Sequence, residues 1–266
     1  MQPDLLSPPF GYGIVDGLGR AWQRGQSPNL SGQCFRARAI GPLIEIANLG
    51  STERLHQIRR ESWFSDGSLE ALVDAFLDGA TQWVARDLRE GMVKGEGLED
   101  EAVLTSFKID AHKAAIAAGF GSQAKFLIAA LGELVGNVVE HSENSGSAAA
   151  FFCAGKGEFE FVVSDRGIGV LDSLTQNPEH SGLSDHGAAL EAMVEEGVSR
   201  HACDTGHGHG FRPIFEKLAD MTGELRFRSG DYVLTLDGRF GDRIARETNQ
   251  KARIQGFLAA VNCKIG

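Results

Sequence analysis

Cysteine is scarce in this chain of 266 residues, and signals for export or membrane insertion are missing. The cysteines share no CxxC spacing, so we interpret them as reduced thiols. The stretch MQPDLLSPPFGYG has no basic segment followed by an apolar one, and no apolar run approaches the roughly 18 residues that span a bilayer. We therefore expect a cytoplasmic protein with no membrane partner. The cysteines are Cys34, Cys153, Cys203 and Cys263.

Basic residues are also fewer than acidic ones. The chain has 26 Lys and Arg against 36 Asp and Glu, and its net charge is −10 with a pI near 5.3. Proteins that bind nucleic acid need a basic surface to displace the counterions of phosphates, so we do not expect that role. Apolar residues make up 42% and charged residues 23%, which is typical of a globular protein with one large or two modest domains.

The first hundred residues predict a smaller α/β domain. Residues 1–30 are rich in Pro, Gly, Ser and Asn and predict a loop or arm. Residues 33–48 read as strand-like segments interrupted by Gly41 and Pro42, and a short helix is expected from about Ser51. This domain matches no pattern of known function, and its place ahead of the second domain suggests that it senses a signal or holds a partner.

The end of this first domain is marked by a helix and a glycine-rich stretch. Residues 68–88 repeat apolar side chains at helical spacing after a Ser68 cap, which predicts a long amphipathic helix. It forms the core of the domain or a contact in a homodimer, and we favour the core because a small domain must bury such a stripe. Residues 91–101 are acidic and glycine-rich, so we expect domains over 1–100 and 101–266.

The second domain alternates predicted strands and helices. We expect a strand over 102–110, a helix over 123–141, two strands joined by Gly155, Lys156 and Gly157, a helix over 185–197, another from about residue 211, a hairpin around residues 229–231 and a strand over 256–265.

The helix over 123–141 carries polar residues on the face opposite its apolar stripe. Glu133, Asn137, Glu140 and His141 fall at i, i+4, i+7 and i+8 and therefore share one face. An ordinary surface helix shows the same pattern, so this spacing alone does not identify a site.

A second candidate is VVSDRGIGV, residues 162–170. Asp165 stands just beyond a predicted strand, and Gly167 and Gly169 permit a positive φ or a close approach to a ligand. A carboxylate at a strand end can accept a hydrogen bond from an exocyclic amine such as that of adenine. An Asp-Gly turn with nothing bound explains the same residues.

A third candidate is DTGHGHGF, residues 204–211. Gly206, Gly208 and Gly210 alternate just before a predicted helix, where free amides and the helix N-terminus can cradle phosphate oxygens. A flexible connection remains the alternative. His207 and His209 do not predict a metal site, because they stand two residues apart with no third ligand nearby in sequence.

Together and in this order, the three stretches resemble the GHKL superfamily of ATP-binding domains. Residues 133–141 are similar to its N box, residues 165–169 to its first glycine box and residues 206–210 to its second. The resemblance covers about residues 102–266. It implies an α/β sandwich in which helices lie on one face of a mixed, largely antiparallel sheet, the Bergerat-type ATP-binding fold.

The resemblance also implies roles for individual residues. Asn137 would coordinate Mg²⁺, Asp165 would receive the adenine amino group, and Gly167 and Gly169 would let the chain pass close to the base and sugar. Mg²⁺ suits such a site because it prefers few protein oxygens and completes its octahedron with water and phosphate. The phosphates would be held beneath a mobile lid by Gly206, Gly208, His209 and Gly210.

Two further residues of the N box receive roles in the same way. Glu133 lies one turn before Asn137, where a glutamate acts as general base on water or a hydroxyl in the hydrolysing and serine-phosphorylating branches. His141 is expected to be structural rather than catalytic.

Among the branches of the superfamily, the compact anti-sigma-factor type of serine kinase is most similar. A histidine kinase would need a phosphoacceptor histidine on paired long helices, and Glu140 stands where that branch has a basic residue. The transducer domain of the topoisomerase, chaperone and mismatch-repair members is not found. We expect an ATP- and Mg²⁺-dependent kinase that phosphorylates a partner protein in signalling. The alternatives are an ATP-gated interaction module without turnover, a trans-acting histidine kinase and a simple ATPase.

Overall fold

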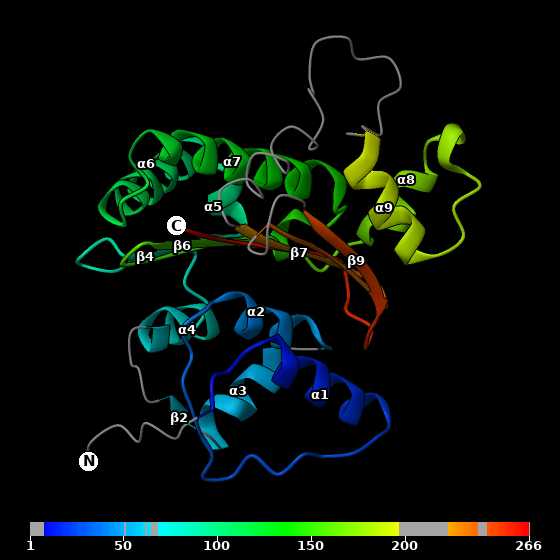
Figure 1. Cartoon of the computed structure of the whole chain (residues 1–266), viewed down its shortest axis with the longest axis horizontal. Coiled ribbons are helices and arrows are strands. Elements are labelled where there is room, and N and C mark those ends of the chain that lie inside the picture. Colours follow the sequence, from blue (N-terminus) through cyan, green and yellow to red (C-terminus); the bar gives the residue numbers. More distant parts are fainter. Residues whose placement is uncertain are drawn as a thin grey trace.

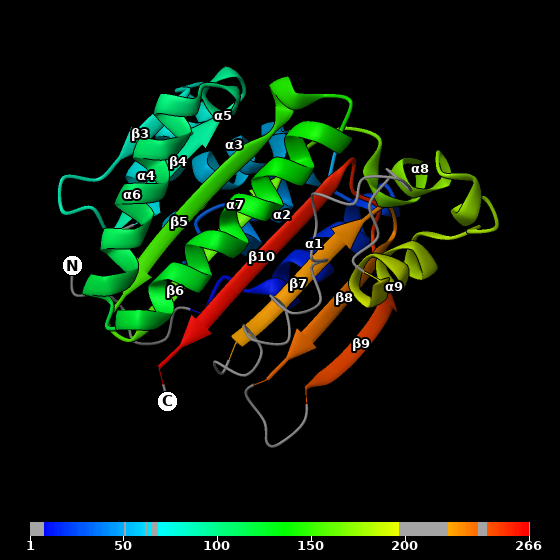
Figure 2. The same ribbon diagram turned by 90° about the horizontal axis from the view of Figure 1, so that it is seen from above.

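A computed structural model describes residues 8–50, 52–61, 63–64, 69–196, 223–238 and 244–265. Its centre is an eight-stranded sheet in which every described pair of neighbours is antiparallel (Figure 2). The strands lie in the order β3 (Gln82–Val84), β4 (Glu90–Lys94), β5 (Ala149–Gly155), β6 (Glu158–Ser164), β10 (Phe257–Lys264), β7 (Gly223–Ser229), β8 (Tyr232–Asp237) and β9 (Ala245–Gln250).

Strand β10 joins two halves of this sheet. It pairs with β6 on one side and β7 on the other, so that Ala260 lies opposite both Val162 and Arg226. Strands β5 and β6 form the predicted hairpin, as do β7 and β8, and β10 is the predicted strand of residues 256–265.

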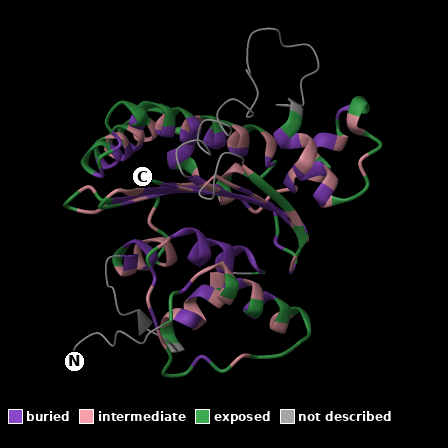
Figure 3. Cartoon of the chain, in the orientation of Figure 1, coloured by how far each residue is buried: buried purple, intermediate pink, exposed green. Residues whose placement is uncertain are grey.

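Helices cover one face of the sheet and bury the first of two hydrophobic cores (Figure 1, Figure 3). These helices are α5 (Glu96–Glu99), α6 (Glu101–Ala117), α7 (Ala124–His141), α8 (Gly169–Thr175) and α9 (His186–Glu196). Side chains of a strand alternate between its two faces, so every second residue of these strands faces the helices. Phe159, Phe161 and Phe227 are such residues, and they pack in one core with the apolar stripe of α7. Helices α7 and α9 confirm the predictions for 123–141 and 185–197.

The second core lies on the opposite face, beneath the N-terminal helices (Figure 1). Phe151, Val162 and Leu258 point to this side and pack in one cluster with Leu43 and Ile44. The elements of this layer are α1 (Tyr12–Gln23), α2 (Gly41–Asn48), α3 (Thr52–Glu61), α4 (Glu70–Leu77) and a two-stranded parallel sheet of β1 (Cys34–Phe35) and β2 (Trp63–Phe64). The chain is thus an α+β protein: the helices that follow residue 100 lie on one face of the sheet, and the N-terminal layer covers the other.

Two predictions for the N-terminal layer are wrong. Residues 1–30 were expected to lack structure, but α1 occupies Tyr12–Gln23. Residues 33–48 were expected to be strand-like, but within them only Cys34–Phe35 is a strand, and the second half of the stretch is the helix α2. Pro42 occupies its first turn, where the missing amide costs nothing. All eight residues of α2 are buried, so its sequence shows no amphipathic pattern that would separate helix from strand. The short helix expected from about Ser51 is α3.

The structure differs from the sequence-based predictions in two places near residue 100. The helix predicted over 68–88 ends at Leu77, because Gly79 turns the chain with a φ of +87°, and residues 82–84 form β3. The glycine-rich stretch 91–101 holds most of β4 and the short helix α5. Strands β3 and β4 thus precede residue 100 and still belong to the sheet that contains β5.

The strand predicted over 102–110 is instead part of the helix α6. The Asp100 carboxylate accepts hydrogen bonds from the amides of Ala102 and Val103 at 2.9 and 3.1 Å, which is the geometry of a helix N-cap. Phe107 and Ala111 are buried at helical spacing on the side that faces the first core. In the part of the chain that the structure describes, no helix is long and apolar enough to cross a membrane.

Candidate functional site

A pocket opens where α7, the end of β6, α8 and the start of β10 meet. We call it the Asp165 pocket. Its lining is mostly apolar, and Asp165 is the only carboxylate among the described lining residues. These residues are Asn137, Val138, His141, Ser142, Asp165, Gly169, Val170, Ser173, Leu174, Met193 and Phe257.

Asp165 follows directly on the last residue of β6 and is only 3% exposed. Its amide donates to the carbonyl of Phe257 at 2.9 Å, and its Oδ1 accepts from the amide of Gly167 at 2.7 Å. Burial raises the pKa of Asp165 from 3.8 to about 6, although hydrogen bonding of the carboxylate to the backbone of Gly167 and Phe257 acts in the opposite direction. A buried carboxylate is therefore held in an apolar pocket.

The glycines after Asp165 are required by close packing. A Cβ on Gly167 would lie 1.8 Å from the carbonyl oxygen of Ser142, which accepts a hydrogen bond from the amide of Ile168 at 3.0 Å. Gly169 has a φ of +79°, and a Cβ there would lie 2.8 Å from Oγ of Ser229. Both positions exclude larger residues for steric reasons, so the loop is built to lie against its neighbours.

Ser229 and Gly256 complete the wall behind this loop, and the sequence analysis missed both. Ser229 Oγ accepts from the amide of Val170 at 2.9 Å and donates to the carbonyl of Gly256 at 3.3 Å. Gly256 has a φ of +73°, and a Cβ there would lie 2.6 Å from Oδ1 of Asp165. Each residue stands at a turn beside a strand, where serine and glycine are common. Their sequence positions therefore do not indicate that they support the Asp165 loop, and only their contacts in the folded chain show it.

Asn137 on α7 also lines this pocket. Its Nδ2 donates to the carbonyl of Glu133 at 2.8 Å, which leaves Oδ1 as the atom available to a ligand. Glu133 is exposed and is not among the lining residues. His141 lines the pocket, and its Nε2 lies 3.9 Å from Oε2 of Glu140.

One amide oxygen is a suitable but insufficient ligand for Mg²⁺, which usually takes its other oxygens from water and phosphate. Within the described ranges, no group of three or more His, Cys, Asp and Glu is placed to hold a metal ion. The donor set therefore fits a magnesium ion that arrives with a phosphorylated ligand.

The second glycine box cannot be placed against this pocket. Gly206, Gly208, His209 and Gly210 lie outside the described residues, as does the helix expected from about residue 211.

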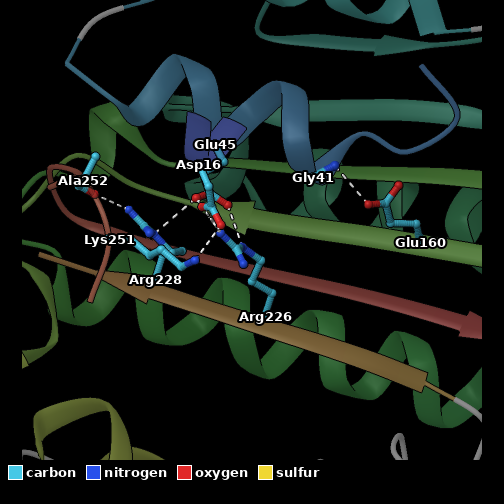
Figure 4. Close-up of polar contacts among 8 residues, drawn as sticks. All are labelled: Asp16, Gly41, Glu45, Glu160, Arg226, Arg228, Lys251 and Ala252. Carbon is cyan, nitrogen blue, oxygen red and sulfur yellow. Dashed lines mark hydrogen bonds and ion pairs between the residues drawn. The ribbon is translucent and has the colours of Figure 1, made fainter. Parts of the chain in front are cut away.

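The strands that lead to the pocket are fixed on their opposite face by buried charges (Figure 4). On β6, the Glu160 carboxylate accepts from the amides of Ile40 and Gly41, at 2.6 and 2.9 Å, at the start of α2. This is a favourable place for a negative charge because the first amides of a helix have no partner within it. Burial nevertheless raises the pKa of Glu160 from 4.5 to about 7.

Strand β7 is fixed in a similar way by five residues that we call the buried charge cluster: Asp16, Glu45, Arg226, Arg228 and Lys251 (Figure 4). Arg226 forms a bidentate pair with Glu45, with Nε–Oε2 at 2.8 Å and Nη2–Oε1 at 3.0 Å. Its Nη2 also donates to Oδ1 of Asp16 at 3.1 Å. Arg228, the residue before Ser229, pairs with Glu45 at 3.3 Å.

Comparison with protein-family models, curated proteins and solved structures finds no match to this chain.

Proposed function

We propose that the chain is an ATP-binding signalling protein and that the adenine ring occupies the Asp165 pocket. One observation carries this proposal: a carboxylate that is 3% exposed closes an apolar pocket, with Oδ1 held by the amide of Gly167. An ionised carboxylate is costly to bury unless its hydrogen bonds are completed. The amino group of adenine would complete them, and Val138, Leu174 and Met193 would contact the ring.

The phosphates would extend from the pocket past Asn137. Its Oδ1 is the free acceptor on that side and would bind Mg²⁺ together with phosphate oxygens. The glycines of residues 206–210 would hold the phosphates through their amides, as the resemblance to the GHKL superfamily implies.

We further propose that ATP serves phosphoryl transfer to a hydroxyl of a partner protein, as in the anti-sigma-factor type of kinase. Glu133 is exposed one helical turn from Asn137, so a partner's hydroxyl can reach it and give up its proton to the carboxylate. Bound Mg²⁺ would stabilise charge on the phosphates. The alternative is an ATP-gated interaction module without turnover, which has no need of Glu133.

The test of the nucleotide site is isothermal titration with a non-hydrolysable ATP analogue, with and without Mg²⁺. The variant Asp165→Asn replaces one oxygen by a hydrogen-bond donor of the same size, so binding should fall by about 100-fold, given that a lost charged hydrogen bond costs roughly 1.5–3 kcal/mol. Asp110→Asn on α6 is a matched control, because it removes the same charge outside the pocket. Equal affinity of the two variants would refute the adenine site.

Glu133→Ala separates the kinase from the interaction module. If the chain is a kinase, this variant retains nucleotide affinity and loses phosphoryl transfer by about 100-fold or more, measured as release of ADP with the partner present. Turnover that is unchanged by Glu133→Ala would exclude a general-base role. A chain that binds ATP and never releases ADP would be the interaction module.

A further inference from the structure

A second pocket, remote from the first, is lined almost entirely by hydrogen-bond donors. It has a volume of about 340 Å³ and lies between the end of α1 and the segment that follows β9. We call it the basic pocket, and its lining residues are Arg20, Gln23, Arg24, Gln250, Lys251 and Ala252. It shares no lining residue with the Asp165 pocket. Three cations and no carboxylate among the described lining residues are unexpected in a chain with a net charge of −10.

The two arginines of this pocket stand close together, and neither has a counter-ion in the part of the chain that the structure describes. Arg20 and Arg24 are four residues apart at the end of α1, both are exposed, and no ion pair with another described residue is recorded for either. The dipole of α1 favours cations at its C-terminal end, but two like charges at this spacing repel each other. The dipole does not explain Lys251, which comes from a different segment. An anion between these side chains would relieve their repulsion.

The buried charge cluster adjoins the pocket. The buried charge cluster contains three cations and two carboxylates, and its Lys251 also lines the basic pocket, with Nζ 2.7 Å from Oδ2 of Asp16 (Figure 4). Arg228 is 1% exposed and donates through Nη2 to the carbonyl of Ala252, another lining residue. Its Nη1 is buried and has no hydrogen-bond acceptor among the described residues. The first carboxylate that follows Arg228 in the chain is Asp231, whose Oδ2 accepts a hydrogen bond from Nε2 of Gln250 at 2.7 Å.

We propose that the basic pocket binds the phosphate group of a small soluble molecule. Guanidinium groups bind phosphate through paired hydrogen bonds, and an ammonium adds a point charge, so Arg20, Arg24 and Lys251 suit a dianion. Apart from Lys251, the two cations of the cluster balance its two carboxylates, so the charge that attracts the anion is that of the three lining cations themselves. The volume is that of a site for a small ligand, so the molecule that carries the phosphate is also small.

The proposal is tested by titrating the full chain with inorganic phosphate and with glycerol 3-phosphate at constant ionic strength. The variant Arg20→Gln/Arg24→Gln removes both exposed charges. The matched control is Arg86→Gln/Arg89→Gln, which removes two exposed arginines from the turn between β3 and β4. Circular dichroism and thermal unfolding establish that all proteins are folded.

Binding of either probe with a dissociation constant near or below about 1 mM, weakened about tenfold or more in Arg20→Gln/Arg24→Gln and unchanged in the control, is the expected result. Equal binding by the two double variants would place phosphate elsewhere on the chain and overturn the proposal. Absence of binding of both probes at about 20 mM would overturn it as well, since a built phosphate site is saturated well below that concentration.

Discussion

The ionised side chain of Asp165 destabilises the fold, because its carboxylate is buried. Burial raises its pKa from 3.8 to about 6, so the folded chain binds more protons than the unfolded chain between these values. The contribution of this group to stability therefore rises as the pH falls through that window. Above pH 6 the ionised form destabilises the fold, by about 3 kcal/mol if the whole shift is counted.

Asp165→Asn should thus be more stable than the wild type at pH 8, by about 1–3 kcal/mol. The advantage should shrink as the pH is lowered from 6 towards 4, where the wild-type carboxyl becomes protonated in the folded state. Urea unfolding of both proteins at pH 8 and pH 5 measures the difference. A variant that is less stable at pH 8 would mean that the carboxylate is already well solvated or paired.

Gly167 is the residue at which added volume is least tolerated. A Cβ would lie 1.8 Å from the carbonyl oxygen of Ser142, and that atom is backbone, so relief requires the loop or the end of α7 to move. Gly167→Ala should cost about 2–4 kcal/mol and abolish nucleotide binding.

Gly136→Ala provides the control for this substitution. Gly136 lies in α7, and a Cβ there would meet no described atom within 4 Å. Alanine should stabilise the helix by about 1 kcal/mol. Equal effects of the two substitutions on chemical unfolding would contradict the packing of the loop against Ser142.

At the scale of elements, the sequence predicts what local patterns determine. The helix over 123–141 and the hairpins around residues 156 and 230 follow from an apolar stripe or from glycine at a turn, and each is present. The helix α2 has no such pattern because it is buried on all sides. Strand β9 is polar and mostly exposed at the edge of the sheet, so it gives no alternation to detect.

The residues of the candidate site also fall into two groups: those that a local sequence pattern predicts and those that only the folded chain brings together. Asn137, Asp165 and Gly169 belong to motifs with recognisable spacing, and they line one pocket. Ser229 and Gly256 come from separate turns and act through contacts that only the folded chain brings about. Arg226 and Arg228 alternate with apolar residues, a pattern that favours exposure, yet the N-terminal layer buries them. No local pattern predicts that a second layer covers this face.

The buried charge cluster makes β7 dependent on α2. Glu45 is 1% exposed and pairs with both Arg226 and Arg228, so Glu45→Gln leaves two buried cations without their principal partner. We expect a loss of about 3–5 kcal/mol in the free energy of unfolding. Glu53→Gln on α3 serves as a control, because its pair with Arg60 is exposed and worth less than about 1 kcal/mol. Losses of the same size in the two variants would show that the cluster does not hold the layer in place.

For the whole molecule, the second core ties the N-terminal layer to the sheet. A fragment of residues 101–266 lacks α1–α4, β3 and β4 and exposes Phe151, Val162 and Leu258, which lie in that core. We expect it to aggregate or to remain unfolded, because so large an apolar surface is not stable in water.

The measurement is soluble expression followed by thermal unfolding of this fragment beside the full chain. A fragment of residues 81–266 separates the contribution of the two strands from that of the N-terminal layer, since it retains β3 and β4 and lacks α1–α4 and the small sheet of β1 and β2. A soluble 101–266 fragment that unfolds cooperatively would favour two independent domains with the boundary near residue 100.

The position of β10 has a consequence for biosynthesis. Its partners β6 and β7 leave the ribosome before it, and each can form a hairpin with its own neighbour while the edge that β10 will cover stays open. Open edges invite pairing with other chains, and contacts between distant segments form slowly. The edges of β6 and β7 in the two half-sheets therefore remain unpaired until β10, which joins them, has been translated. The nascent chain should depend on chaperones that shield strand edges during that interval.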